Sequence, residues 1–150
     1  MPITVSIKYD DKEIKRYFNK VEKGLRDFKE PLGDSADELI KEFYGDKVFE
    51  TEGAAVGKKW SPLKARTLQA RARGYGHYAK SPITTGRVMI WTGALKKGFK
   101  KTVSSFKAVI ENKVKYFKYA NNKRPVFGIN KEVMSIVEKN FEKYFKKILK

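Results

Sequence analysis

The stretch Phe99-Lys-Lys-Thr-Val-Ser-Ser-Phe-Lys-Ala-Val-Ile-Glu-Asn-Lys-Val-Lys-Tyr-Phe-Lys-Tyr119 decides the fold class of this chain. Its β-branched and aromatic residues fall in three short runs, which predict an antiparallel meander over 99–103, 107–112 and 113–119. A sheet with one apolar face must be covered by helices. The sequence therefore predicts one α+β domain over 1–150, with an antiparallel sheet of about four strands and amphipathic helices packed on one face.

Further elements are expected on both sides of this stretch. Ile3, Val5 and Ile7 alternate with polar residues, which predicts a half-buried opening strand, and residues 126–127 are expected to add a sheet edge. Pro31-Leu-Gly33 is expected to end a first helix, and Asn130 to cap the last one. Helices are expected over 11–29, 35–48, 62–72 and 131–149. Apolar residues at helical spacing predict the first, second and last of these, and Ser61-Pro62, which suits a helix start, predicts the third.

The charge of the chain is concentrated in one segment. From Gly53 to Ile110 there is no Asp or Glu but thirteen Lys and Arg, so this segment supplies +13 of the net +17. Seven of the eleven glycines lie in the same segment. Residues 53–86 are therefore expected to form a flexible basic arm, followed by a basic strand region. A field of one sign predicts a negatively charged partner, although solubility alone is the simpler explanation.

Two sets of residues follow from this interpretation. The basic side chains expected to bind the partner are Lys58, Lys59, Lys64, Arg66, Arg71, Arg73, Lys80, Arg87, Lys96, Lys97, Lys100 and Lys101. Aromatic residues interleave with them, as in proteins that stack nucleic-acid bases. We nevertheless favour a core position for Trp60 and Trp91, which would pin the glycine-rich region to the body, and Tyr75 and Tyr78 stay open.

Catalytic and metal chemistry finds no support in the sequence. There is no cysteine, and His77 is the single histidine, so a site of the usual His and Cys type cannot be assembled. Gly53-Ala-Ala-Val-Gly57-Lys58-Lys59 lacks both the spacing and the hydroxyl of a phosphate-binding loop. We expect no enzyme activity, cofactor or metal. No apolar run is long enough for a membrane span, and no membrane partner is expected.

Four short pieces, taken in order, resemble the virion morphogenesis and tail-completion proteins of tailed bacteriophages. The first is Phe49-x-x-x-Gly53, and the second is Lys59-Trp60-Ser61-Pro62-Leu63 with Thr67-Leu68. The third is Thr92-Gly93-Ala94-Leu95-Lys96 with Phe99. The fourth is Tyr119-Ala120 with Arg124-Pro125-Val126-Phe127-Gly128-Ile129-Asn130, where the intervening connection is shorter than is usual in that family.

The resemblance implies a non-enzymatic structural protein of the phage neck or tail, which joins or completes the tail as part of an oligomeric ring. The implied partners are other virion proteins with an acidic surface, further copies of this chain and packaged DNA, in the virion and in the host cytoplasm during assembly. The alternative is a nucleic-acid-binding protein that uses segment 53–110. The residues expected to anchor the fold are Trp60, Pro62, Leu63, Trp91, Gly93, Leu95, Arg124, Pro125, Phe127 and Gly128.

Overall fold

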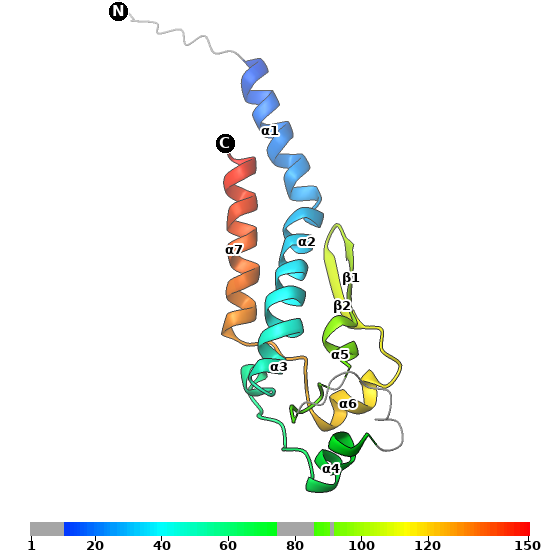
Figure 1. Ribbon diagram of the computed structural model, residues 1–150. Coiled ribbons are helices and arrows are strands. Elements are labelled where there is room, and N and C mark those ends of the chain that lie inside the picture. Colours follow the sequence, from blue (N-terminus) through cyan, green and yellow to red (C-terminus); the bar gives the residue numbers. More distant parts are fainter. Residues whose placement is uncertain (1–10, 75–85, 91) are drawn as a thin grey trace, which may run out of the picture.

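The chain folds into a two-stranded antiparallel sheet and a set of helices, which confirms the α+β class (Figure 1). A computed structural model describes residues 11–74, 86–90 and 92–150. The elements are α1 (Asp11–Arg26), α2 (Lys29–Glu38), the π-helix η1 (Leu39–Lys47), α3 (Val48–Glu50), the 3₁₀ turn η2 (Ala54–Val56), α4 (Ala65–Arg73), α5 (Ala94–Lys97), β1 (Phe99–Ser104), β2 (Lys107–Asn112), α6 (Phe117–Lys123) and α7 (Lys131–Ile148).

The centre of the fold is one continuous helical rod from Lys29 to Glu50, formed by α2, η1 and α3. The predicted break at Pro31 is wrong, because Pro31 lies in the first turn of α2. Backbone N–H groups in the first turn of a helix have no hydrogen-bond partner within the helix, so the N–H that proline lacks is not needed there. The break falls earlier, where the Phe28 amide donates to the Ser105 carbonyl at 2.8 Å. The Asp27 carboxylate accepts from the Lys29 amide at 3.0 Å and so starts the rod.

The hairpin β1–β2 and helix α7 lie on opposite sides of this rod in Figure 1, and both contact α2. The register pairs Phe99 with Asn112 and Ser104 with Lys107 around a two-residue turn. The predicted last helix, 131–149, is confirmed by α7 (Lys131–Ile148), and the Asn130 side chain caps it by accepting from the Val133 amide at 2.9 Å.

The predicted third strand, 113–119, is wrong. The Asn112 side chain accepts from the Val114 amide at 3.1 Å and donates to the Leu95 carbonyl at 2.7 Å, which turns the chain away from the sheet. Residues from Phe117 onward form α6, where Phe117 and Ala120 face the core at helical spacing. The described residues thus form two of the about four strands expected from the sequence.

The other strand expectations have different outcomes. The opening strand at Ile3 to Ile7 lies outside the described residues. Residues 126–127 form no strand, because Val126 is fully buried and its amide donates to the Asn121 side chain at 2.9 Å rather than to a sheet. The predicted helix 62–72 also begins later, at Ala65, since the Ser61 carbonyl is bonded by Arg124 and does not start a helical turn.

The core lies between the C-terminal half of the rod, the base of the hairpin and the segment around Val126. It is rich in aromatic rings that meet edge to face, such as Phe99 against Phe127 and Phe117 against Phe127. Its members that are almost or completely buried include Phe43, Val48, Phe49, Trp60, Val88 and Val126. The core therefore joins pieces from nearly the whole described chain, which places segments distant in sequence side by side.

Candidate functional site

Trp60 connects three of the four resembling pieces. Its ring is 4% exposed and meets Phe49 edge to face, with 5.6 Å between centroids. Its Nε1 donates to the Pro125 carbonyl at 2.8 Å. Gly53 has φ +85°, and a Cβ there would lie 2.2 Å from Trp60 Nε1. The structure thus favours the core position for Trp60 over base stacking, and it explains why a glycine stands at position 53.

Two arginines hold the segments that surround this anchor. The Arg124 guanidinium donates to the Ser61 carbonyl through Nη2 at 3.2 Å and through Nε at 3.4 Å. Arg71 is 7% exposed, and its Nη1 donates to the carbonyls of Arg87 and Ile90 at 3.0 and 3.2 Å. Both side chains therefore hold backbone in place, so Arg71 is not displayed for a partner as the sequence interpretation supposed.

The third resembling piece forms a tight turn that leads into α5. Gly93 has φ +77°, and its carbonyl accepts from the Lys97 amide at 3.0 Å. The Leu95 side chain is buried and packs in the core. The Leu95 carbonyl accepts the hydrogen bond from the Asn112 side chain described above, which ties this turn to the hairpin.

These pieces come together around one groove with a volume of about 720 Å³. The second piece contributes Leu63 and Thr67, the third contributes the turn 92–95, and the fourth contributes Ala120 and Arg124. The remaining described residues that line the groove are Lys64, Arg71, Met89, Tyr116 and Lys123. Segments separated by some sixty residues in the sequence thus build a single surface feature.

The groove combines an apolar lining with a cationic rim. Leu63, Met89 and Leu95 supply apolar surface, while the ammonium groups of Lys64 and Lys123 belong to exposed side chains. Such a site suits a segment that carries an apolar side chain next to carboxylates, since the lining buries the first and the rim attracts the second.

The predicted partner-binding residues fall into three groups. Lys96 pairs with Asp46, and Lys101 pairs with Asp37, so these two stabilise the fold as Arg71 does. Lys80 lies outside the described residues, as does the anchor candidate Trp91. The described residues offer no ion-pair partner to the exposed side chains Lys58, Lys59, Lys64, Arg66, Arg73, Arg87, Lys97 and Lys100.

The other predicted anchors differ in burial. Pro62 is exposed, whereas Phe127 is half-buried and meets the Tyr44 ring edge to face at 5.1 Å. The Tyr44 hydroxyl donates to the Gly128 carbonyl at 2.9 Å, and burial raises the pKa of Tyr44. A Cβ on Gly128 would lie 3.0 Å from the Val56 side chain, so this position is also closely packed.

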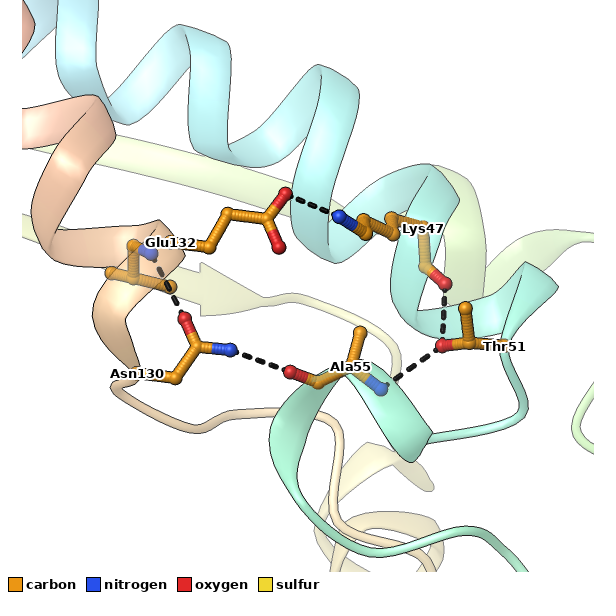
Figure 2. Close-up of polar contacts among 6 residues, drawn as sticks. Lys47, Thr51, Ala55, Asn130 and Glu132 are labelled. Carbon is orange, nitrogen blue, oxygen red and sulfur yellow. Dashed lines mark hydrogen bonds and ion pairs between the residues drawn. The ribbon is translucent and has the colours of Figure 1, made fainter.

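A second polar cluster fixes the start of α7 to the end of the rod (Figure 2). The Asn130 amide group donates to the Ala55 carbonyl at 2.6 Å, and the Ala55 amide donates to the Thr51 hydroxyl at 3.1 Å. Lys47 and Glu132 form an ion pair above this chain of hydrogen bonds, as Figure 2 shows. The cluster is structural, because its polar groups satisfy one another.

Sequence reasoning missed three groove residues, namely Met89, Tyr116 and Lys123. Tyr116 was missed because 113–119 was assigned to a strand, and Lys123 because it was read as part of the connection before Arg124. The i, i+3 spacing of Phe117 and Ala120 would have indicated the helix that holds Lys123. Met89 lies at φ +58°, a backbone conformation for which the sequence carries no signal.

Other kinds of site are not found in the described ranges. No group of three or more His, Cys, Asp or Glu residues there is placed to hold a metal ion. None of the described helices combines the length and the apolar character that crossing a membrane requires. Comparison with protein-family models, with curated proteins and with solved structures gives no match for this chain.

Proposed function

We propose that this chain is a non-enzymatic assembly protein of the bacteriophage head-to-tail junction, acting in the neck or in tail completion within an oligomeric ring. The proposal is supported by one observation above all. The pieces on which the resemblance rests are scattered over residues 49–130, yet three of them line one groove and the first, Phe49 to Gly53, packs against the Trp60 anchor.

The mechanism that we propose is docking of an acidic partner. An acidic segment of a neighbouring virion protein inserts an apolar side chain between Leu63 and Leu95, and its carboxylates meet Lys64 and Lys123. The basic arm at about 53–86 extends this contact through Lys58, Lys59, Arg66 and Arg73, which are exposed and have no ion-pair partner among the described residues. A sheet with more strands than β1 and β2 forms only in the assembled ring.

Co-sedimentation of the full chain with phage heads and with tails tests this function. We expect the wild type to associate with one of the two. Reversal of the rim charges in Lys64→Glu with Lys123→Glu should weaken the association about tenfold or more, because charge complementarity across an interface is replaced by repulsion. The genes on either side of the coding sequence give a simple first check, since capsid, portal and tail-tube genes are expected there.

The matched control is Lys115→Glu with Lys118→Glu, which makes the same charge change on exposed residues outside the groove. It should leave the association nearly unchanged. A chain that stays monomeric at high concentration and associates with neither heads nor tails would contradict the proposal.

Nucleic-acid binding is a second candidate, favoured by the nine described basic side chains of segment 53–110, Lys107 among them, that are exposed and form no ion pair with described residues. It predicts an affinity for DNA that falls linearly, on a log–log scale, as salt rises. A useful variant neutralises only side chains without a structural task, namely Lys58, Lys59, Lys64, Arg66, Arg73, Lys97 and Lys100. Equal DNA affinity of this variant and the wild type would rule this candidate out.

A further inference from the structure

A second groove, with a volume of about 540 Å³, is lined mainly by apolar side chains. It is lined by Leu39 and Tyr44 of the rod, Ala108 and Ile110 of β2, and Phe127 and Val133. None of the described residues that line it is charged, and Ile129 at its border is 82% exposed. An apolar surface of this kind, beside a strand, is typical of a docking site.

The strand that borders this groove has an open edge. Among the described residues β2 pairs with β1 alone. The Lys113 amide donates to the Gly98 carbonyl at 2.9 Å, so these two residues form a hydrogen-bonded pair. Because hydrogen-bonded and non-hydrogen-bonded pairs alternate along an antiparallel ladder, this bond fixes which residues direct their backbone N–H and C=O groups toward β1. The backbone N–H and C=O groups of Ala108 and Ile110 therefore point away from β1. No hydrogen bond from the described part of the chain reaches them.

The sequence contains a segment that fits this edge. Ile3, Val5 and Ile7 alternate with Thr4, Ser6 and Lys8, so a strand of these residues presents three apolar side chains on one face and polar ones on the other. Beside β2, the apolar face would cover Leu39, Tyr44 and Val133 in the groove.

Residues 3–7 cannot reach the groove of their own chain. Helix α1 runs from the rod past the tip of the hairpin, and its first residue, Asp11, lies at the far end (Figure 1). Its 16 residues span about 24 Å at 1.5 Å per residue. Ile7 precedes Asp11 by four residues and reaches back at most about 14 Å. If residues 3–7 occupy the groove, they therefore come from another copy.

Helix α1 adds an independent observation. Residues 11–20 are exposed without exception, and they include Ile14, Tyr17 and Phe18, the last of which is 64% exposed. A helix of this length without tertiary cover is marginal in water. A neighbouring copy that receives residues 3–7 would also lie next to this apolar stripe.

We propose that residues 3–7 of one copy add as a strand to the β2 edge of a second copy, with Ile3, Val5 and Ile7 seated in the apolar groove. The inference rests on the proposed function for the ring and names the contact between its neighbouring subunits. The surface that gives the strand, residues 3–7, differs from the surface that receives it, the β2 edge, so the contact is head-to-tail. Repetition of this contact closes a ring when the rotation between neighbouring copies adds up to a full turn.

Amide hydrogen exchange at single residues tests the backbone part of this contact. In the assembled wild type, the amides of Ala108 and Ile110 should exchange about tenfold or more slowly than in Val5→Asp, which places a charge in the apolar groove. The amide of Val109 points toward β1 and is an internal control that should be protected in both. Ser6→Asp is the matched variant on the polar face and should behave like the wild type.

Mixing of two full-length variants tests the direction of the contact. Val5→Asp lacks a strand that can be inserted, and Ile110→Asp lacks a β2 edge and groove that can receive one. Each variant alone should therefore be monomeric by light scattering. Their mixture retains one good contact per pair and should form a dimer and nothing larger. Val109→Asp, on the other face of β2, is the control for Ile110→Asp and should assemble as the wild type does.

Two results would overturn the inference. One is a Val5→Asp chain with wild-type mass and wild-type protection at Ile110. The other is a wild-type chain that stays monomeric, with fast exchange at Ala108 and Ile110, at the highest soluble concentration. If Val5→Asp still forms rings on phage particles, the inference fails and the proposed function stands. If the wild type assembles through β2 but ignores phage particles, the proposed function fails instead.

Discussion

At the scale of single residues, Gly53 and Gly57 offer a direct comparison. Both have a left-handed backbone, with φ +85° and φ +91°, but a Cβ on Gly53 meets Trp60 Nε1 whereas one on Gly57 meets no atom within 4 Å. Gly57→Ala should therefore cost about 1 kcal/mol of unfolding free energy from backbone strain alone. Gly53→Ala should cost about 1–3 kcal/mol more, because the Trp60 anchor must shift.

Thermal unfolding measures this difference. For a chain of this length each kcal/mol corresponds to about 2–4 °C in Tm. Equal Tm values for the two variants would show that the contact of Gly53 with Trp60 does not contribute to stability.

Glu38 predicts a pH dependence. Hydrogen bonds from Asn140 and Lys139 lower the pKa of Glu38 from its usual 4.5. Its contribution to stability is therefore complete above the unfolded pKa and is lost as pH falls through the lower folded value. We expect Glu38→Gln to lower the Tm by about 2–4 °C at pH 7, with the difference from wild type vanishing in acid.

Calorimetry at a series of pH values checks this expectation. The control is Glu42→Gln, an exposed carboxylate on the same rod without an ion pair among the described residues. A Tm difference between Glu38→Gln and the wild type that stays constant from neutral to acid pH would contradict the role given to Glu38.

At the scale of elements, the rod contains the π-helix η1, and Gly45 makes it possible. A Cβ on Gly45 would lie 2.3 Å from the Ile40 carbonyl oxygen, a backbone atom that cannot move aside. Gly33 lies on the same rod, where a Cβ would meet only the Lys101 ammonium at 3.8 Å. Gly45→Ala should destabilise by about 1–3 kcal/mol, whereas Gly33→Ala should stabilise by about 0.5–1 kcal/mol.

Denaturant titration of both variants separates these effects, since each starts from the same residue type in the same helix. A Gly45→Ala protein as stable as the wild type would mean that the π-helix relaxes to an ordinary α-helix without cost.

The success of sequence reasoning also differs by element. Helix α7 was predictable, because the Asn130 cap and a regular apolar stripe specify it locally. The break before the rod and the course of the chain after Asn112 were not, because they depend on bonds to distant groups, such as Phe28 to Ser105 and Asn112 to Leu95. The groove between the resembling pieces was out of reach for the same reason, although several of its residues were named.

At the scale of the whole molecule, charges of opposite sign are segregated along the chain. Residues 29–52 hold eight acids and three lysines, while the segment from 53 to 110 holds thirteen basic residues and no acid. The rod pairs with both neighbours, through Asp37 to Lys101 on the hairpin and through Glu30 to Lys147 on α7 at 2.6 Å. These pairs neutralise only part of the positive field, so most of it stays available to a partner.

This arrangement predicts how stability responds to salt. Screening of the net +17 should outweigh the weakening of exposed ion pairs, each of which is worth about 0–1 kcal/mol. The Tm should therefore rise between about 10 and 200 mM NaCl. Neutralising Lys58, Lys59, Lys64 and Arg66 to Gln should flatten this rise, whereas Asp37→Asn, which adds net positive charge, should steepen it. A Tm that falls with salt would mean that the ion pairs around the rod, rather than the unpaired basic surface, dominate the electrostatics of the free protein.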